Sequence, residues 1–266
     1  MLLDFDRLGA LRYALIGAAV LVGAFLMLPI LTIAALSFGS SRYLQFPPAA
    51  WTTKWYSQLF ADPDWLSSFL TSFEIALTVA VVATVIGLAA SFGLTRGRFP
   101  GREAIRALML TPMVLPVVIL AVALYAFFLR IHLNGTFVGF VMAHTVVALP
   151  FAVISISNAL ERFDKSIEDA AVVCGASPLE AKLRVTLPAI RDGLFGALIF
   201  SFLASWDEVV IAIFMASPDL QTLPVRIYST LRQDLSPVIA AVSTLLVAMT
   251  VALMALVALL RRGKTA

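Results

Sequence analysis

The sequence contains few charged residues, and this scarcity limits the classes of protein to which it can belong. Only 13% of its 266 residues are Asp, Glu, Lys or Arg, whereas 61% are hydrophobic. Soluble domains carry about 25% charged and 45–50% apolar residues. A soluble enzyme, a disordered chain and a fibrous protein are therefore poor fits, and most of the chain is expected to lie in lipid.

Cysteine and histidine are also scarce, and the basic residues form no block. The single cysteine, Cys174, excludes an internal disulfide, and no Cys/His cluster suggests a metal site. The net charge of +3 and the pI near 9.2 are compatible with nucleic-acid binding. Because no basic domain or solvated basic stripe accompanies them, we expect no nucleic-acid partner.

Long apolar runs predict an all-α integral membrane protein with one transmembrane domain over residues 1–266. A helix needs about 20 apolar residues to cross the ~30 Å hydrocarbon core. Five runs are long enough and free of charge, and a sixth is interrupted by Asp207 and Glu208. Apolar and polar residues do not alternate, so helices are expected rather than barrel strands. The six predicted spans are 12–37, 72–95, 106–129, 136–160, 193–216 and 238–260.

The distribution of basic residues predicts how these spans are oriented. Six spans place both termini on one side, and 14 of the 19 Lys and Arg residues fall on that side. The positive-inside rule therefore places both termini in the cytoplasm. The first apolar run is longer than the apolar region of a signal peptide, so we expect an uncleaved anchor.

The outer loop over residues 38–70 is the longest connection on its side and is rich in aromatic residues. Two interpretations stay open: an aromatic belt at the membrane interface, or a docking surface for a soluble partner. The aromatic residues are Trp51, Trp55, Tyr56, Phe60 and Trp65.

The cytoplasmic loop over residues 161–192 is the least hydrophobic stretch of its length and predicts two short helices. Ser166 is a candidate N-cap for the first, and Gly175 fits the left-handed position that ends a helix. Ser177 and Pro178 are typical of the start of the second helix, which Pro188 is expected to stop. A short capped helix with small residues suits docking into a groove on another protein. The alternative is an amphipathic helix lying on the inner leaflet.

This loop resembles the EAA loop of bacterial ABC importer permeases. Asp169-Ala170-Ala171, then Gly175, then Val185-x-Leu187-Pro188 keep the spacing of that motif, with Asp in place of the usual Glu. Glu168 precedes the motif, so acidity is retained. The resemblance implies a type I ABC importer permease fold in a bacterial inner membrane, with this loop as the coupling helix that docks on the ATPase. The candidate coupling residues are Glu168, Asp169, Ala170, Ala171, Gly175, Ser177, Leu187 and Pro188.

The same resemblance implies partners that this chain lacks. We expect two copies of an ATPase, a second permease that is a different chain, and a soluble substrate-binding protein outside the membrane. ATP and Mg are expected on the ATPase, and no cofactor on this chain. The sequence Gly263-Lys264-Thr265 is no phosphate loop, because Ala258 stands where that loop needs a glycine.

Asp207 and Glu208 are the most distinctive residues within a predicted span. An ionised carboxylate near the centre of a membrane helix costs about 2.5–3.5 kcal/mol, so such residues usually face a cavity or a partner. We predict a cation-attracting point on a substrate path, formed with Trp206. The alternatives are a bond to another helix or a break in the helix.

The residues from Ser205 to Ile211, with Leu223-Pro224-Val225-Arg226 downstream, resemble spermidine/putrescine-type permeases. This resemblance implies import of a polyamine or a related small cation by alternating access; another small solute is the alternative within the class. A stand-alone secondary transporter or channel is a further alternative, although no internal repeat is visible. His144 is expected to bond to a neighbouring helix or to face the path. No nucleophile–base pair is visible, so no chemistry on the substrate is expected.

Overall fold

The computed structural model describes residues 10–233 and 236–262, and these residues form α-helices joined by short connections. Within those ranges the only β-type pairing is two isolated bridges, Gly39 with Trp51 and Ser217 with Leu220. The all-helical prediction is therefore confirmed for the described part of the chain. Gly263, Lys264 and Thr265 lie outside the described residues.

Three of the helices are long and apolar enough to cross a membrane, and two bent helix pairs raise this number to five. The apolar stretch of the last helix is shorter, Val238–Ala252, among the residues that were described. The structure thus supports three to five of the six predicted spans by length and composition. The three long helices are α1 (Ala10–Ser37), α3 (Pro63–Arg96) and α6 (Phe137–Arg162), and the last is α13 (Val238–Arg262).

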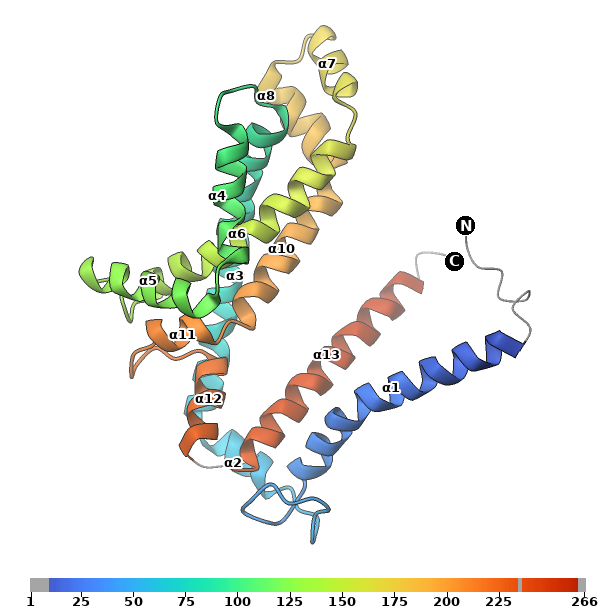
Figure 1. The fold of residues 1–266 in the computed structure, drawn as a ribbon, viewed down its shortest axis with the longest axis vertical. Helices are drawn as coiled ribbons and strands as arrows, with labels where there is room; N and C mark the ends of the chain where they lie inside the picture. Colours follow the sequence, from blue (N-terminus) through green and yellow to red (C-terminus); the bar gives the residue numbers. More distant parts are fainter. Residues whose placement is uncertain (1–9, 234–235, 263–266) are drawn as a thin grey trace. The chain divides into compact units, whose positions relative to one another are not determined.

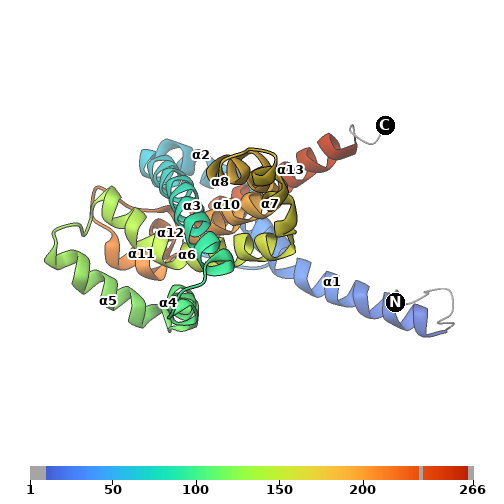
Figure 2. The same cartoon turned by 90° about the horizontal axis from the view of Figure 1, so that it is seen from above.

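The predicted span 106–129 is divided into two helices rather than one. Helix α4 (Arg102–Val114) and helix α5 (Val117–Arg130) meet at an angle of 106°. Leu115 has an extended backbone with φ −70° and ψ 142°, because a residue before proline is pushed out of the helical region. In Figure 2, α4 is seen nearly end-on while α5 lies across the view.

The predicted span 193–216 is also interrupted. Helix α10 (Arg191–Trp206) ends immediately before the acidic pair, and a short helix α11 (Val210–Met215) follows it. The chain also bends just before this span, since the helical stretches Pro178–Ala189 and Arg191–Trp206 meet at an angle of 71°. Helix α12 (Leu223–Gln233) then leads toward α13.

The chain divides into two compact units, and each is described by itself. The first unit comprises Met1–Trp65 and Ser229–Ala266; within it α1 packs along α13, and α2 (Lys54–Ala61) also contacts α13. The aromatic-rich loop over residues 38–70 contains the buried Trp55, whose Nε1 donates to the Gly39 carbonyl at 2.6 Å. Trp51 and Phe60 are exposed, so both interpretations of the aromatic loop stay open.

In the second unit, Leu66–Tyr228, α6 packs closely against α10, and α3 approaches α6 where Gly87 faces Ala152. Gly193 of α10 faces Ala159 of α6 so closely that a Cβ would collide with it, and Ser155 Oγ donates to the Gly193 carbonyl at 3.1 Å. Small residues allow such an approach, on which helix association in lipid depends. In Figure 1, α7 and α8 lie at one end of α4, α6 and α10, and α5 and α11 lie near the other.

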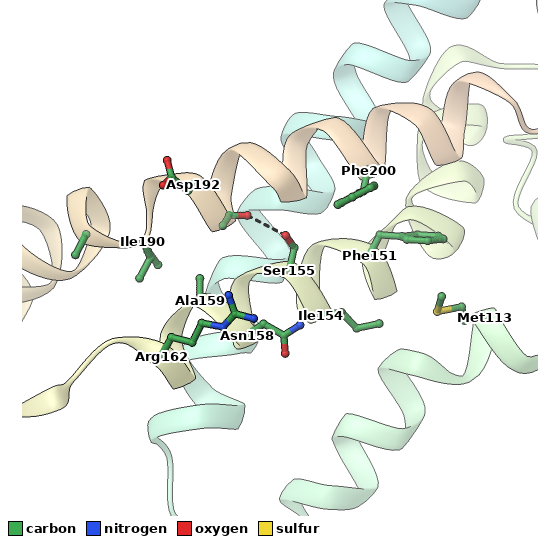
Figure 3. A pocket seen from close by; sticks show the side chains of 12 residues that line it. Met113, Phe151, Ile154, Ser155, Asn158, Ala159, Arg162, Ile190, Asp192 and Phe200 are labelled. Carbon is green, nitrogen blue, oxygen red and sulfur yellow. Dashed lines mark hydrogen bonds between the residues drawn. The ribbon is translucent and has the colours of Figure 1, made fainter. Parts of the chain in front are cut away.

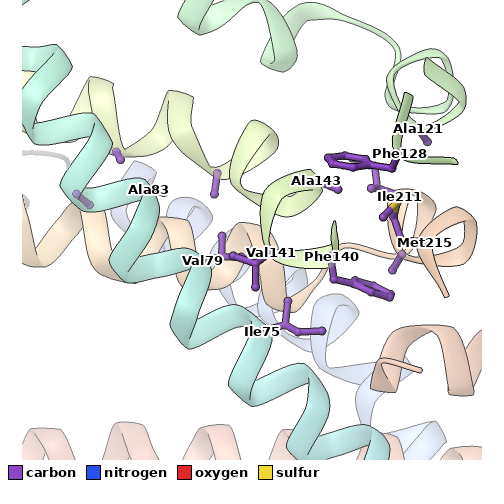
Figure 4. Close-up of a cluster of buried hydrophobic side chains, with 14 of the residues drawn as sticks. Ile75, Val79, Ala83, Ala121, Phe128, Phe140, Val141, Ala143, Ile211 and Met215 are labelled. Carbon is purple, nitrogen blue, oxygen red and sulfur yellow. The ribbon is translucent and has the colours of Figure 1, made fainter. Parts of the chain in front are cut away.

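A cluster of buried apolar side chains fills the second unit. It includes residues from α3, α5, α6, α10, α11 and α12, and Figure 4 shows Phe140 and Met215 beside Ile211 at its centre. Ser91 of α3 adds a polar tie, since its Oγ donates to the Val153 carbonyl at 3.2 Å and accepts from Ser157 Oγ at 3.1 Å. The break after Trp206 therefore occurs inside a packed unit.

Two glycines of α3 provide a matched test of this packing. A Cβ at Gly87 would lie 2.7 Å from the Ala152 Cβ, whereas a Cβ at Gly93 would meet nothing within 4 Å. We expect Gly87→Ala to lower the unfolding midpoint of the purified permease, because overpacking costs about 1–3 kcal/mol. Gly93→Ala should leave the midpoint unchanged or raise it, because alanine is the better helix former by about 1 kcal/mol. Equal midpoints for the two variants would contradict this packing.

Candidate functional site

The loop over residues 161–192 begins with a capped helix, α7 (Lys165–Val173), which starts one residue before Ser166. Its N-cap is Asp164, whose carboxylate accepts from the Ser166 N–H at 2.9 Å, so the expectation that Ser166 is the cap was wrong. Asp is at least as good a cap as Ser, and this cap lies two residues earlier. The hydrogen bonds from Ser166 lower the pKa of Asp164, so the cap is lost only when the pH falls through that lowered value.

The turn after α7 follows the prediction closely. Gly175 has φ +99°, the left-handed conformation that glycine adopts most readily. Ser177 Oγ accepts from the Glu180 N–H at 3.2 Å and caps the helix α8 (Pro178–Ala181). Both features are confirmed.

Pro188 does not stop the second helix where we expected. The chain continues from α8 through a π-helical segment, η2 (Lys182–Thr186), into α9 (Leu187–Ala189). In this segment the Leu187 N–H bonds to the Lys182 carbonyl, five residues back. Pro188 lies in the first turn of α9, where its missing N–H is tolerated, and the bend comes at Ile190.

The loop exposes most of the residues that were predicted to couple it to the ATPase. Ala171 and Leu187 are half-buried. Glu168 differs from the rest: its side chain is buried within the loop, so it cannot offer its carboxylate to a docked partner. Sequence reasoning missed Val173, which is 87% exposed and is an apolar side chain beside the small residues of the motif. The exposed members of the predicted set are Asp169, Ala170, Gly175, Ser177 and Pro188.

Arginine side chains fix the base of this loop to the helices beside it. Arg96 at the end of α3 donates from Nη2 to the carbonyls of Leu160 and Phe163, at 3.0 and 2.9 Å. Leu160 lies in the last turn of α6 and Phe163 is its C-cap, a region where a helix leaves carbonyls without intrahelical partners. Arg106 of α4 also lies 3.9 Å from the Glu161 carboxylate. The end of α6, where the loop begins, is therefore fixed to α3 and α4.

A groove of about 630 Å³ lies along α6 and α10 next to the base of the loop. In Figure 3, Arg162 and Asp192 lie toward one end of the groove and Phe151 and Phe200 toward the other. A cation and an anion share the polar end, so the groove by itself selects no charge of solute. Its remaining lining includes Met113, Ser155 and Asn158.

The acidic pair lies at the break between α10 and α11, and its two members have different environments. Glu208 Oε1 accepts from the Ile211 N–H at 2.7 Å, which ties this carboxylate to the first turn of α11. Asp207 is the C-cap of α10, its side chain is exposed, and it forms no ion pair within the described ranges. The structure therefore gives Glu208 a capping role and leaves Asp207 available to another group.

Four aromatic side chains pack together around Trp206, the residue before Asp207, and we call them the aromatic row: Phe69 and Phe73 of α3 with Phe202 and Trp206 of α10. Phe202 stacks on Trp206 with centroids 5.7 Å apart, and Phe69 meets the same indole edge-on at 5.5 Å. Phe73 contacts Phe202 at 5.9 Å. Aromatic faces attract ammonium groups. Of this row the sequence indicated Trp206 alone, because Phe69 and Phe73 are brought there by tertiary packing.

His144 is confirmed as a packed histidine that is bonded to a neighbouring helix. Its Nδ1 lies 2.9 Å from Ser205 Oγ on α10, and the ring is buried. This bond crosses between α6 and α10 just before the acidic pair. Among the described residues, no group of three or more His, Cys, Asp or Glu side chains is placed to hold a metal.

Comparisons with known proteins give a consistent assignment. Residues 83–265 match the family model described as "Binding-protein-dependent transport system inner membrane component". The spermidine/putrescine transport system permease protein PotC of Escherichia coli (strain K12) is 29% identical over 242 residues, which are 91% of this chain and 91% of PotC. The putrescine transport system permease protein PotI of the same strain is 35% identical over 105 residues, 40% of this chain and 37% of PotI.

A solved structure shows the same fold. The crystal structure of a bacterial ABC transporter involved in the import of the acidic polysaccharide alginate contains a chain that superposes with a TM-score of 0.69. The superposition covers 94% of this chain and 96% of that one, at 16% identity. At this identity the likeness concerns the fold, which is that of a type I ABC permease.

Proposed function

The chain belongs to the family of inner membrane components of binding-protein-dependent transport systems, and from this premise we propose that it is the permease subunit of a polyamine importer. The observation that carries the substrate class is the likeness to PotC over 91% of both chains. Asp207 supports it, since this residue is exposed, forms no ion pair within the described residues and directly follows Trp206 of the aromatic row. Fixed negative charge and aromatic faces both attract ammonium groups.

Asp207 lies on the substrate path in this proposal, together with Trp206 and the rest of the aromatic row. A carboxylate left exposed to hydrocarbon would cost about 2.5–3.5 kcal/mol, which favours a watery path or a partner helix as its surroundings. Glu208 has a structural role in this proposal, because its carboxylate accepts from the Ile211 N–H and fixes the start of α11. The polyamine passes unchanged, and this chain performs no chemistry on it.

The topology we propose is six spans with both termini in the cytoplasm. The supporting observation is the distribution of Lys and Arg, 14 of 19 on one side. In this topology α4 and α5 together make the third span, α10 with α11 makes the fifth, and α13 makes the sixth. The loop with α7 then faces the cytoplasm.

Helix α7 docks on an ATPase subunit in the proposed assembly. Asp169, Ala170 and Val173 are exposed on this helix, which gives a small, partly apolar surface that suits a groove. Two ATPase copies hold ATP and Mg, a second permease chain completes the path, and a substrate-binding protein delivers the polyamine. ATP binding draws the ATPases together, α7 follows, and the path opens outward; hydrolysis resets it.

Gly175→Glu tests the docking of α7. We expect the variant to insert normally but to lose ATP-driven uptake and to copurify with less ATPase. A side chain at φ +99° is strained by about 1–2 kcal/mol, and the carboxylate would stand at the docking surface. Gly101→Glu is the matched control, because Gly101 also has a positive φ of 83° and open space but lies outside the coupling loop. Equal uptake by the two variants would argue against docking through this loop.

Asp207→Asn tests the substrate path. Uptake of labelled spermidine and putrescine into vesicles should show a KM at least about tenfold higher, since truncating one partner of a desolvated charge pair costs on the order of 2–5 kcal/mol. Glu208→Gln should have a smaller effect, because its amide oxygen still accepts from the Ile211 N–H. Normal uptake by both single variants and by the double variant would show that the substrate path does not pass Asp207 or Glu208. A wild-type complex that imports another solute and no polyamine would overturn the substrate class.

A further inference from the structure

A buried carboxylate joins the two arms of the cytoplasmic loop. Glu168 of α7 is 8% exposed, and its Oε2 accepts from the Thr186 hydroxyl at 2.7 Å. Thr186 is fully buried and is the last residue of η2. The two residues are 18 positions apart, one on the arm that leaves α6 and the other on the arm that returns to α10.

No other side-chain hydrogen bond or ion pair in the described structure connects these two arms. The remaining polar contacts within residues 164–189 stay inside one arm: Lys165 with Asp169 on α7, and Glu180 with Ser177 and Arg184 on the second. The backbone between the arms turns at Gly175, which has a positive φ and nothing near its Cβ position. Backbone hydrogen bonds from Gly175 to Val172 and from Ala176 to Ala171 close this turn, and α7 packs against α8 and η2. The bond between Glu168 and Thr186 is the side-chain hydrogen bond that the described residues add to this packing.

The burial of Glu168 is costly and therefore informative. A carboxylate removed from water is destabilising unless it is paired or hydrogen-bonded, and no Lys or Arg of the described residues forms an ion pair with it. Its place in the first turn of α7 helps, because the helix dipole favours negative charge there. The short bond from Thr186 supplies the rest, and a hydrogen bond to an ionised group is among the stronger ones.

Hydrogen bonds and packing on the second arm connect Thr186 to the start of α10. The Thr186 carbonyl accepts from the buried Ile190 N–H at 3.0 Å, directly before α10 begins. From there Gly193 packs on Ala159, and Ser155 donates to the Gly193 carbonyl, the dashed bond in Figure 3. In the π-helical segment η2 the backbone hydrogen bond spans five residues instead of the four of an α-helix. The extra residue rotates the following residues about the helix axis relative to those before it.

We propose that Glu168 and Thr186 form a latch that makes α7 and the base of α10 move as one body. With the latch closed, a displacement that the ATPase imposes on α7 passes into α10 instead of being absorbed at Gly175. Both are positioning residues, since neither touches the substrate nor lies at the exposed docking surface. This role rests on the proposed docking of α7 on the ATPase.

Thr186→Val tests the latch, because valine keeps the shape of threonine and removes the donor. In proteoliposomes with the complete importer, we expect polyamine uptake per ATP hydrolysed to fall about tenfold, the factor that losing a hydrogen bond to a charged group corresponds to. ATPase copurification and the ATPase rate should be retained. Thr186→Ser should restore the ratio, and Thr111→Val, which removes a hydroxyl bond within α4, should leave it unchanged. A wild-type ratio in Thr186→Val would overturn the latch.

A second measurement is independent of substrate and of the proposed function. Spin labels on the native Cys174 and on Ile199→Cys report the distance between the end of α7 and α10 in the purified full-length permease. We expect one narrow distance distribution in the labelled protein that retains Thr186, and a broad distribution when Thr186→Val is added. Where Thr186→Val fails to fold, Glu168→Ala removes the buried charge together with the bond and should show the same broadening. Distributions of equal width would refute the latch, whether or not the importer carries polyamines.

Discussion

The close contact between α6 and α10 is the constraint on which the rest of the second unit depends. Gly193 presents no side chain, so Ala159 of α6 occupies the space that a Cβ would fill, and Ser155 bonds to the Gly193 carbonyl. The loop that contains α7 connects the end of α6 to the start of α10. Asp207 lies at the other end of α10, whose 16 residues give it a length of about 24 Å. One helix therefore links the proposed motor contact to the proposed substrate path.

Three polar side chains of this unit bond to helix ends or to neighbouring helices. Arg96 satisfies the carbonyls at the end of α6, Glu208 bonds to the start of α11, and His144 bonds to Ser205 across the two central helices. Each of these bonds lies at a helix end or joins two helices. Such groups are expensive in a low-dielectric interior unless they have partners, and once paired they fix geometry. Asp207 differs from these groups, because it is exposed and forms no ion pair within the described residues, and the transport proposal assigns its carboxylate to the substrate path.

Features that depend on local sequence could be predicted, and features that depend on tertiary contacts could not. The ends of α1 and α6, the turn at Gly175 and the cap at Ser177 follow from apolar runs and capping chemistry. The apolar run over 106–129 predicted one span, and its length and composition could not show that α5 turns by 106° from α4. The bond between Glu168 and Thr186 and the contact of Phe69 with Trp206 join distant positions, and no spacing rule places them together. The sequence therefore shows an acidic residue at position 168, but it does not predict that the Glu168 side chain is buried within the loop.

The central claim is that the loop with α7 lies in the cytoplasm and is covered by an ATPase, and the single native cysteine tests it without mutation. Cys174 is exposed at the end of α7. A membrane-impermeant maleimide should label the permease in inside-out vesicles stripped of ATPase and not in right-side-out vesicles. Adding the ATPase back should slow the labelling. Labelling from the outer side, or a rate that the ATPase leaves unchanged, would contradict the account.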